Sequence, residues 1–367
     1  MKGVCAMFGL YVHIPYCASK CRYCDFYSAA GNHNVPDSYV DALCREMDRF
    51  SPCGSTPLRP DTLYFGGGTP SLLTAAQLAR LIDTAGPVAG AEITLEANPE
   101  TVSKESLVAY RQAGVNRISF GVQSAFDVQL ARLGRRHTAA QSRLALQWAR
   151  EVGFVNISGD LMLALPDYTL DELKATVELL CEGGCTHISS YLLKIEPNTV
   201  FGRRPPENLP DEDAAADFYL AAVELLEKAG YGQYEISNFS KPGFEGRHNL
   251  NYWNCADYLG LGPAAHSCMG GKRFYTPAGT AAFCEKPAEY VADGACTAED
   301  FIMLQLRLTS GLNLETLKQA YGVVWDEKKF AFAQRLQESG LARFDGHTLA
   351  LTPRGMLLQN SILVELI

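Results

Sequence analysis

The chain has 367 residues, of which 47% are hydrophobic and 20% are charged, and its formal net charge is −9. This composition is ordinary for a globular protein with one large and one smaller domain. The negative charge excludes the broad basic surface that nucleic-acid binding needs, so we expect no nucleic-acid partner. No stretch resembles a membrane span, and residues 1–6 are too short for the apolar core of a signal peptide. The twelve cysteines are irregularly spaced, which favours a reducing cytoplasm over a disulfide scaffold.

In the first 230 residues, short β-branched runs alternate with amphipathic stretches, a pattern typical of parallel strands joined by helices. We expect strands at 10–14, 62–65, 93–96, 117–121, 155–163 and 187–192. Helices are predicted at 37–50, 75–84, 104–113, 139–152, 170–182 and 211–229, with Thr74 and Ser103 as N-caps. Six such units, rather than eight, predict an α/β fold with an open partial (β/α)6 barrel.

Polar or glycine-rich clusters stand at the ends of these predicted strands. A cysteine loop follows the first strand, a glycine run follows the second, and Glu96-Ala-Asn-Pro ends the third. Gln123 and Asp160 lie at the fourth and fifth strands, and Arg135 follows in a loop. The carboxyl ends of parallel barrel strands build one catalytic surface. We therefore expect one shared pocket, although each residue alone could be a solvated loop residue.

The cysteine loop reads Cys17-x3-Cys21-x2-Cys24. Three thiolates can hold three corners of a cubane cluster, whereas a closed 4Fe–4S carrier needs four. The fourth iron is thus open, and S-adenosylmethionine, through its amino and carboxylate groups, is the ligand that fits. One alternative is a zinc site with His13 as the fourth ligand. Another is three unrelated buried cysteines. For Cys5, Cys44, Cys53, Cys255, Cys268, Cys284 and Cys296 the spacing predicts no partner.

A second motif, Gly66-Gly67-Gly68-Thr69-Pro70, follows a predicted strand. Glycine lets the backbone approach a ligand closely, so this run can cradle the amino end of S-adenosylmethionine. A tight turn between strand and helix is the alternative. Glu96 offers a carboxylate to the ligand's ammonium or ribose hydroxyls, and Tyr23 could stack on its adenine or simply pack.

After about residue 231 the pattern changes. The stretch from 234 to 267 is rich in aromatic residues, glycine and asparagine. A C-terminal unit follows, with helices from 298, near 314–321 and near 327–339, and strands at 341–343 and 348–351 joined by Asp345-Gly346. Three helices and a hairpin resemble a winged helix. The third helix balances Lys328, Lys329 and Arg335 against Asp326, Glu327 and Glu338, which favours packing or protein contact over DNA binding.

Several motifs together resemble the HemN/HemW family of oxygen-independent coproporphyrinogen III oxidases and haem chaperones. They are Tyr11-Val-His-Ile-Pro, the cysteine triplet, the GGGTP run, Glu96-Ala-Asn-Pro, Ile118-Ser-Phe-Gly-Val-Gln-Ser124, Leu133-Gly-Arg-Arg-His137 and Asp160-Leu-Met-Leu-Ala-Leu-Pro166. The resemblance implies a radical S-adenosylmethionine protein with a 4Fe–4S cluster on Cys17, Cys21 and Cys24. The implied S-adenosylmethionine contacts are Tyr11, Gly67, Gly68, Thr69, Glu96, Gln123, Arg135, Asp160 and Leu192.

Two features favour the haem-chaperone branch. Phe26 stands where the oxidases carry the last cysteine of C-x3-C-x2-C-x-C, and an HNxxYW motif is present from His248 to Trp253. The resemblance then implies haem binding and delivery to respiratory haemoproteins, with transient contact to a membrane protein. Imidazole is a common axial haem ligand, so His248 is the candidate haem residue. The alternative is a histidine satisfied in a polar loop, and His13 and His266 are expected to be structural.

Two other functions stay open at this point. Oxidative decarboxylation of coproporphyrinogen III is the first, and Phe26 counts against it. RNA modification by a radical enzyme is the second, with the winged unit in its favour and the acidic charge against it. We expect three units: a radical S-adenosylmethionine core over 1–232, a connecting segment with the haem site over 233–297, and a HemN C-terminal, winged-helix-like domain over 298–367.

Overall fold

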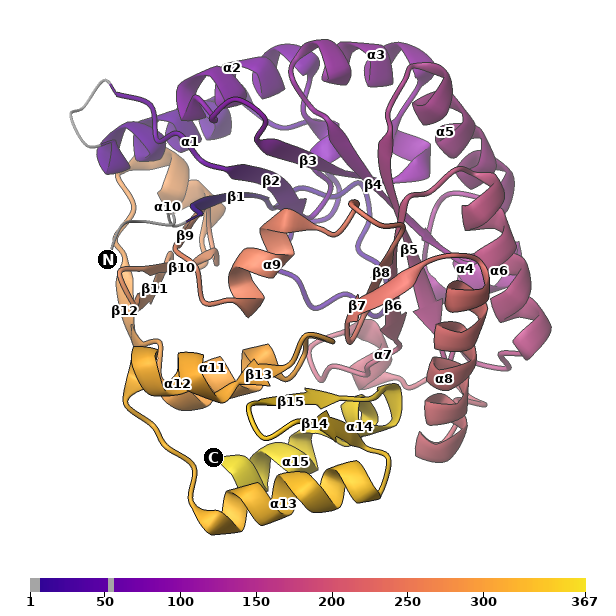
Figure 1. Ribbon diagram of the computed structural model, residues 1–367. Coiled ribbons are helices and arrows are strands. Elements are labelled where there is room, and N and C mark those ends of the chain that lie inside the picture. Colours follow the sequence, from indigo (N-terminus) through magenta and orange to yellow (C-terminus); the bar gives the residue numbers. More distant parts are fainter. Residues whose placement is uncertain (1–6, 52–55) are drawn as a thin grey trace.

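The computed structural model describes residues 7–51 and 56–367, so residues 1–6, Cys5 and Cys53 lie outside the described part. Six parallel strands pair in chain order, each with the next (Figure 1). They are β1 (Gly9–Ile14), β2 (Thr62–Gly67), β3 (Glu92–Ala97), β4 (Arg117–Gln123), β5 (Asn156–Leu163) and β6 (His187–Leu192). The α/β prediction with six repeating units is confirmed, and the sheet is open because no pairing joins its two edge strands in the described chain.

Helices cover the outer side of this curved sheet in Figure 1. The long ones are α1 (Asp37–Phe50), α2 (Ala75–Ala85), α3 (Lys104–Gln112), α5 (Ala139–Glu151), α6 (Leu170–Glu182) and α8 (Glu212–Lys228). Thr74 and Ser103 cap α2 and α3 with reciprocal side-chain and backbone hydrogen bonds, as predicted. Shorter elements that were not predicted are η1 (Pro70–Leu72), η2 (Pro99–Thr101), α4 (Asp127–Leu133) and α7 (Val200–Arg203).

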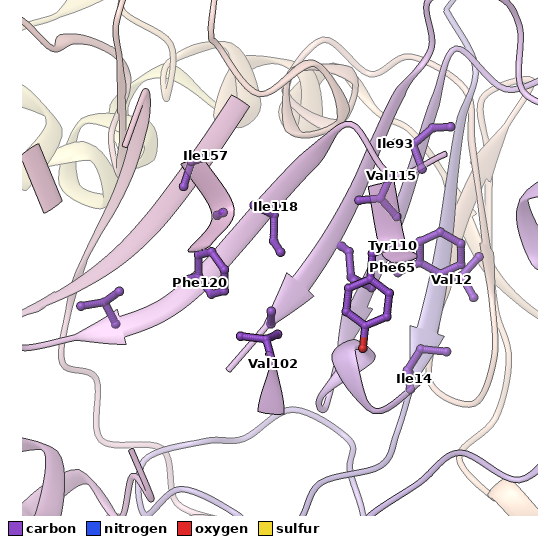
Figure 2. Packing of buried hydrophobic residues seen from close by; sticks show 14 of the residues in the cluster. Val12, Ile14, Phe65, Ile93, Val102, Tyr110, Val115, Ile118, Phe120 and Ile157 are labelled. Atoms are coloured by element: carbon purple, nitrogen blue, oxygen red, sulfur yellow. The ribbon is translucent and has the colours of Figure 1, made fainter. Parts of the chain in front are cut away.

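Alternation of side chains along the strands separates an apolar face from a polar one. Val12, Phe65, Ile93, Ile118 and Ile157 belong to the main apolar cluster, which Figure 2 shows from close by. Their neighbours in sequence point to the other face of the sheet, because successive strand residues alternate. That inner face carries Tyr11 and His13 of β1, Tyr64 of β2, Glu96 of β3, Arg117 of β4 and Asp160 of β5. The core therefore lies between sheet and helices, and the inner face is free for polar groups.

The segment after α8 extends the same sheet at both edges. On the β6 side, β7 (Gly232–Glu235) and β8 (Asn238–Ser240) continue it antiparallel. On the β1 side, β9 (Tyr258–Leu261) pairs parallel with β1, and β10 (His266–Met269), β11 (Lys272–Tyr275) and β12 (Val291–Ala295) follow antiparallel. Two short helices, α9 (Arg247–Trp253) and α10 (Thr280–Glu285), lie between these strands. None of these strands was predicted, because this part of the sequence lacks the alternating β-branched runs that mark the first six strands.

The C-terminal residues have an apolar cluster of their own, built around Leu306, Leu317, Leu336, Leu349 and Ile362. Its elements are α11 (Ala298–Gln305), β13 (Leu312–Asn313), α12 (Leu314–Tyr321), α13 (Glu327–Glu338), β14 (Ala342–Phe344), β15 (Thr348–Leu351), α14 (Pro353–Leu357) and α15 (Gln359–Leu366). The predicted three helices and hairpin are present, with a third strand and two more helices added. Among the described residues, no helix has the length and apolar character that a membrane crossing requires.

A fully buried carboxylate, Glu46, joins α1 to the segment before β12. It accepts hydrogen bonds from the Ala288 backbone, the Tyr290 hydroxyl and the Arg49 guanidinium. Hydrogen bonds to charged groups contribute about 1.5–3 kcal/mol each, so Glu46→Ala is expected to lower the free energy of unfolding by at least about 2 kcal/mol. Urea denaturation followed by circular dichroism measures this.

Asp41→Ala, on the same helix, is the control. Asp41 pairs with Arg80 on the surface, with both side chains more than half exposed, and such pairs contribute about 1 kcal/mol or less. Equal losses in the two variants would contradict the role given to Glu46.

Candidate functional site

The cysteine loop connects β1 to α1 and is held at both ends by backbone hydrogen bonds. The Ala29 amide donates to the Pro15 carbonyl, and the Cys17 amide donates to the Ala29 carbonyl. Cys17 is buried, and Cys21 and Cys24 are partly exposed. Across the described residues, no three histidine, cysteine or carboxylate side chains are gathered closely enough to hold a metal ion as they stand. The three cysteines thus share one loop, and their role as cluster ligands stays a prediction.

Groups from other strand ends already contact two of these thiols. The Thr69 hydroxyl donates to Cys17 Sγ at 3.5 Å, and Arg135 Nη1 donates to Cys21 Sγ at 3.5 Å. Both donors are ones that a metal-bound sulfur can accept from, since cysteine binds metal as the thiolate. Burial raises the pKa of Cys24. The two hydrogen-bond donors, Thr69 and Arg135, therefore suit cysteine sulfur atoms that bind a metal cluster at Cys17 and Cys21.

Arg135 also binds the strand ends together. Its Nη2 donates to Asn98 Oδ1 at 2.7 Å and to the Gly121 carbonyl at 2.6 Å. Its Nε is buried and has no hydrogen-bond partner. A buried donor without a partner is costly, so this nitrogen is available to a bound ligand.

The glycine run lies directly against the cysteine loop. A Cβ on Gly68 would come within 2.7 Å of the Tyr16 carbonyl oxygen and 3.0 Å of Cys17 Sγ. A Cβ on Gly67, which has φ of +110°, would come within 2.5 Å of the His13 ring. The run therefore has to be glycine for the backbone to pass this close to the loop.

Two carboxylates stand on the inner face of the sheet near this run. Glu96 accepts a hydrogen bond from the Tyr64 hydroxyl at 2.7 Å and from the Gly67 amide at 3.2 Å. Burial raises the pKa of Glu96 to about 7, and the nearby charge of Asp160 adds to the rise. Burial likewise raises the pKa of Asp160 to about 6, against the opposing charges of Arg135 and Arg117. Near neutral pH Asp160 is thus mostly ionised and Glu96 partly so, and a bound cation would favour the ionised form of both.

The other predicted S-adenosylmethionine contacts differ in how deeply their side chains are buried. The Tyr11 hydroxyl is hydrogen-bonded to His13 Nδ1 at 2.9 Å. Tyr23 is partly buried against the main apolar cluster, and burial raises its pKa. Gln123 ends β4 with φ of +66° and is 7% exposed, whereas Leu192 ends β6 at the surface with 37% exposed. Leu192 is therefore the least enclosed of the predicted set.

Sequence reasoning missed Asn98 and Arg117. Asn98 Nδ2 donates to Thr69 Oγ1 at 3.2 Å while its Oδ1 accepts from Arg135, so it joins the glycine run to the arginine. Its signal was present in the Glu96-Ala-Asn-Pro motif. Arg117 is 4% exposed on the inner face, and the alternation of strand residues was the signal for it.

The predicted haem residue, His248, lies at the opposite end of the strands. Its Nδ1 is hydrogen-bonded to Thr62 Oγ1 at 2.8 Å and its Nε2 to the Tyr252 hydroxyl at 2.7 Å. Its backbone amide donates to Glu92, the first residue of β3. Burial lowers the pKa of His248 to about 3, so the ring is neutral at physiological pH. In this arrangement both ring nitrogens are engaged, and the side chain is 2% exposed.

Comparisons with known proteins agree with this geometry. Residues 11–180 match the Radical SAM superfamily and residues 297–358 match the HemN C-terminal domain. The chain is 45% identical over 262 residues to "Heme chaperone HemW" of Escherichia coli (strain K12), which covers 70% of this chain and 69% of that protein. It is 36% identical over 369 residues to "Heme chaperone HemW" of Bacillus subtilis (strain 168). This alignment covers 96% of this chain and 97% of that protein.

The chain belongs to the HemW family of radical S-adenosylmethionine proteins. Radical S-adenosylmethionine membership implies a 4Fe–4S cluster and S-adenosylmethionine. Among solved structures, coproporphyrinogen III oxidase (HemN) from Escherichia coli matches with a TM-score of 0.83 and 24% identity, covering 98% of this chain and 90% of that one. At this identity the match shows that HemW-family and HemN chains share the fold.

The contact of Gly68 with the cysteine loop can be tested directly. Gly68→Ala places a methyl group against Tyr16 and Cys17, and overpacking of this kind costs about 1–3 kcal/mol. We expect less iron and sulfide per chain after anaerobic reconstitution, because the loop has to move away from the glycine run. Gly232→Ala, where the added Cβ meets only one atom at 3.9 Å, is the control. Cluster content equal in both variants would contradict this.

Proposed function

We propose that this protein is a haem chaperone that binds haem on a radical S-adenosylmethionine scaffold and delivers it to haemoproteins, respiratory ones among them. The observation that carries the proposal is the full-length similarity to a HemW relative whose name states this function. Phe26 supports it, since this side chain is 70% exposed on the cysteine loop at the position where the oxidases have a fourth cysteine.

For the cluster we propose Cys17, Cys21 and Cys24 as its three protein ligands. When bound, the reduced cluster supplies the electron that cleaves the sulfonium of S-adenosylmethionine. Thr69 and Arg135 hold the side chains of Cys17 and Cys21 in place by hydrogen bonds to their sulfur atoms. Asn98 keeps Thr69 and Arg135 in place relative to each other.

For S-adenosylmethionine we propose a site along the inner face of the sheet, next to the cysteine loop. Gly67, Gly68 and Thr69 let the backbone approach its amino end, and Glu96 binds its ammonium group. The remaining proposed contacts are Tyr11, Tyr23, Gln123, Arg135, Asp160 and Leu192. Their support is the shared position of most of them at the carboxyl ends of β1 to β6.

For haem we propose the segment 233–297, with α9 and the residues after it as the contact region. The His248 ring anchors α9 to the start of β2 through Thr62, while the His248 backbone amide donates to Glu92 at the start of β3. Loss of the ring removes the first of these bonds and is therefore expected to weaken haem uptake by loosening the helix. We propose the same division into units as above: 1–232 for the cluster and S-adenosylmethionine, 233–297 for haem, and 298–367 for protein contact.

Haem uptake and transfer test the function. Anaerobically reconstituted protein should take up haem and pass it to an apo-haemoprotein, measured by absorbance and by recovered activity of the acceptor. His248→Ala should reduce uptake, whereas Tyr252→Phe, which keeps the ring and removes one hydrogen bond to His248, should reduce it less. Formation of protoporphyrinogen from coproporphyrinogen III, without haem transfer, would contradict the proposal.

The pKa of Glu96 generates a prediction about ligand binding. Because burial raises this pKa to about 7, the carboxylate that attracts the ammonium group is lost as the pH falls through 7. Affinity for S-adenosylmethionine should therefore decrease between pH 8 and pH 6, by up to about tenfold per pH unit. Anaerobic isothermal titration calorimetry of cluster-loaded protein measures it.

Glu96→Gln should bind S-adenosylmethionine about 10- to 100-fold more weakly at pH 8, the range expected for loss of a charged hydrogen bond. Its affinity should also vary less with pH than that of the unmodified protein. Glu105→Gln, on the exposed surface of α3, is the control. A pH dependence that survives in Glu96→Gln would assign it to another group.

A further inference from the structure

Three thiols that the proposed site does not use meet beside the end of α9. Cys255 lies just after α9, Cys268 is on β10, and Cys296 stands between β12 and α11. The Cys296 backbone amide donates to the Gly271 carbonyl beside β11, and Cys268 pairs in register with Tyr258, three residues after Cys255. After burial, the Cys296 thiol contributes to raising the pKa of both Cys255 and Cys268. It also lies 3.7 Å from the Tyr321 hydroxyl of α12. Segments far apart in the sequence therefore bring soft donor atoms to one place.

The backbone at Cys255, directly after the C-cap of α9, is in an unusual conformation. Its φ is +51°, in the left-handed region, which costs a residue other than glycine about 1–2 kcal/mol. The Cys255 amide donates to the Tyr252 carbonyl at 3.1 Å, which keeps the turn at the end of α9. Strained backbone of this kind is concentrated at functional sites.

The surroundings of the thiols suit a flat apolar ring that carries carboxylates. The rings of Tyr252 and Tyr258 pack edge to face with centroids 4.5 Å apart, and both are partly exposed. Two exposed lysines are carried by elements of this group: Lys272 on β11, which pairs with the strand of Cys268, and Lys318 one helical turn before Tyr321. In the described part of the chain the lysine ion pairs involve other lysines than these two. Aromatic rings can cover a porphyrin face, and the ammonium groups can meet its propionates.

Accessibility separates these thiols from His248. Cys255 and Cys296 are partly exposed, whereas His248 is 2% exposed and hydrogen-bonded through both nitrogens. Haem iron is ligated in proteins by cysteine thiolate as well as by imidazole. A chaperone has to release its cargo, and a thiol at the surface can release haem without the opening of a buried pocket.

We propose that the thiol pair Cys255 and Cys296 supplies the axial ligand of the haem iron, and this proposal rests on the haem-chaperone function above. A thiol replaces the water bound to ferric iron: the S–H bond breaks, an Fe–S bond forms, and water and one proton leave. No change of iron oxidation state is needed. Transfer to an acceptor reverses this step, with a proton returning to sulfur. Burial raises the pKa of Cys255, which favours the return.

The test compares Cys255→Ser/Cys296→Ser with Cys181→Ser/Cys284→Ser, a control pair of partly exposed cysteines elsewhere. Both variants and the unmodified protein are reconstituted with the cluster, and iron and sulfide contents are matched so that Cys17, Cys21 and Cys24 are occupied. Haem is then added anaerobically, and the spectrum of haem-free protein is subtracted. The ferrous–carbon monoxide complex is recorded, because thiolate ligation moves its main band to long wavelength.

The unmodified protein and the control pair should show the thiolate band, and Cys255→Ser/Cys296→Ser should lose it and bind haem at least about tenfold more weakly. His248→Ala should keep the thiolate band on the haem that it still binds. Haem uptake with a spectrum that is the same in Cys255→Ser/Cys296→Ser, or without a thiolate band in the unmodified protein, would overturn the ligand assignment alone. No haem uptake by the unmodified protein would overturn the chaperone function and the ligand assignment with it.

Discussion

The polar inner face of the sheet depends on the buried guanidinium of Arg117. This first residue of β4 is 4% exposed, and its charge opposes the effect of burial on the carboxyl groups of Glu96 and Asp160. Burial lowers the pKa of His187 and of His248, and the same charge adds to the effect, so both imidazoles stay neutral. Carboxylates and neutral histidines can thus share one enclosed face, because the cation offsets part of the cost of desolvating the carboxylates and keeps the imidazoles uncharged.

The inner face has two chemically different ends. At the carboxyl ends of the strands, the cysteine loop, the glycine run and Arg135 form one hydrogen-bonded group through Asn98. At the amino ends, α9 closes the sheet, with the His248 ring stacked against Tyr64. The proposed cluster and haem regions are therefore separated along the strands. Haem handled near α9 would be away from the sulfonium chemistry at the cysteine loop.

The segment after α8 connects these ends from the edges of the sheet. The Tyr27 hydroxyl of the cysteine loop accepts hydrogen bonds from the Gly279 and Thr280 amides at the start of α10. On the other edge, the Ile236 amide donates to the Arg307 carbonyl, and the Arg307 guanidinium lies 4.2 Å from the Trp253 ring centroid. These contacts fasten the cysteine loop to α10 at one edge of the sheet and the C-terminal unit to the β7–β8 connection at the other.

The sequence by itself determined the repeating strand–helix order, the caps at Thr74 and Ser103, and the family, because period-2 and period-3.6 patterns and contiguous motifs are local. It placed β4 only to Gly121, since the φ of +66° at Gln123 and the shifted register near it arise from pairing with β5. Tertiary structure alone decided the edge strands β7 to β12, the partners of His248, and the meeting of Cys255, Cys268 and Cys296. These depend on contacts between residues far apart in the chain. The number of residues between two positions does not tell how close they lie once the strands have paired.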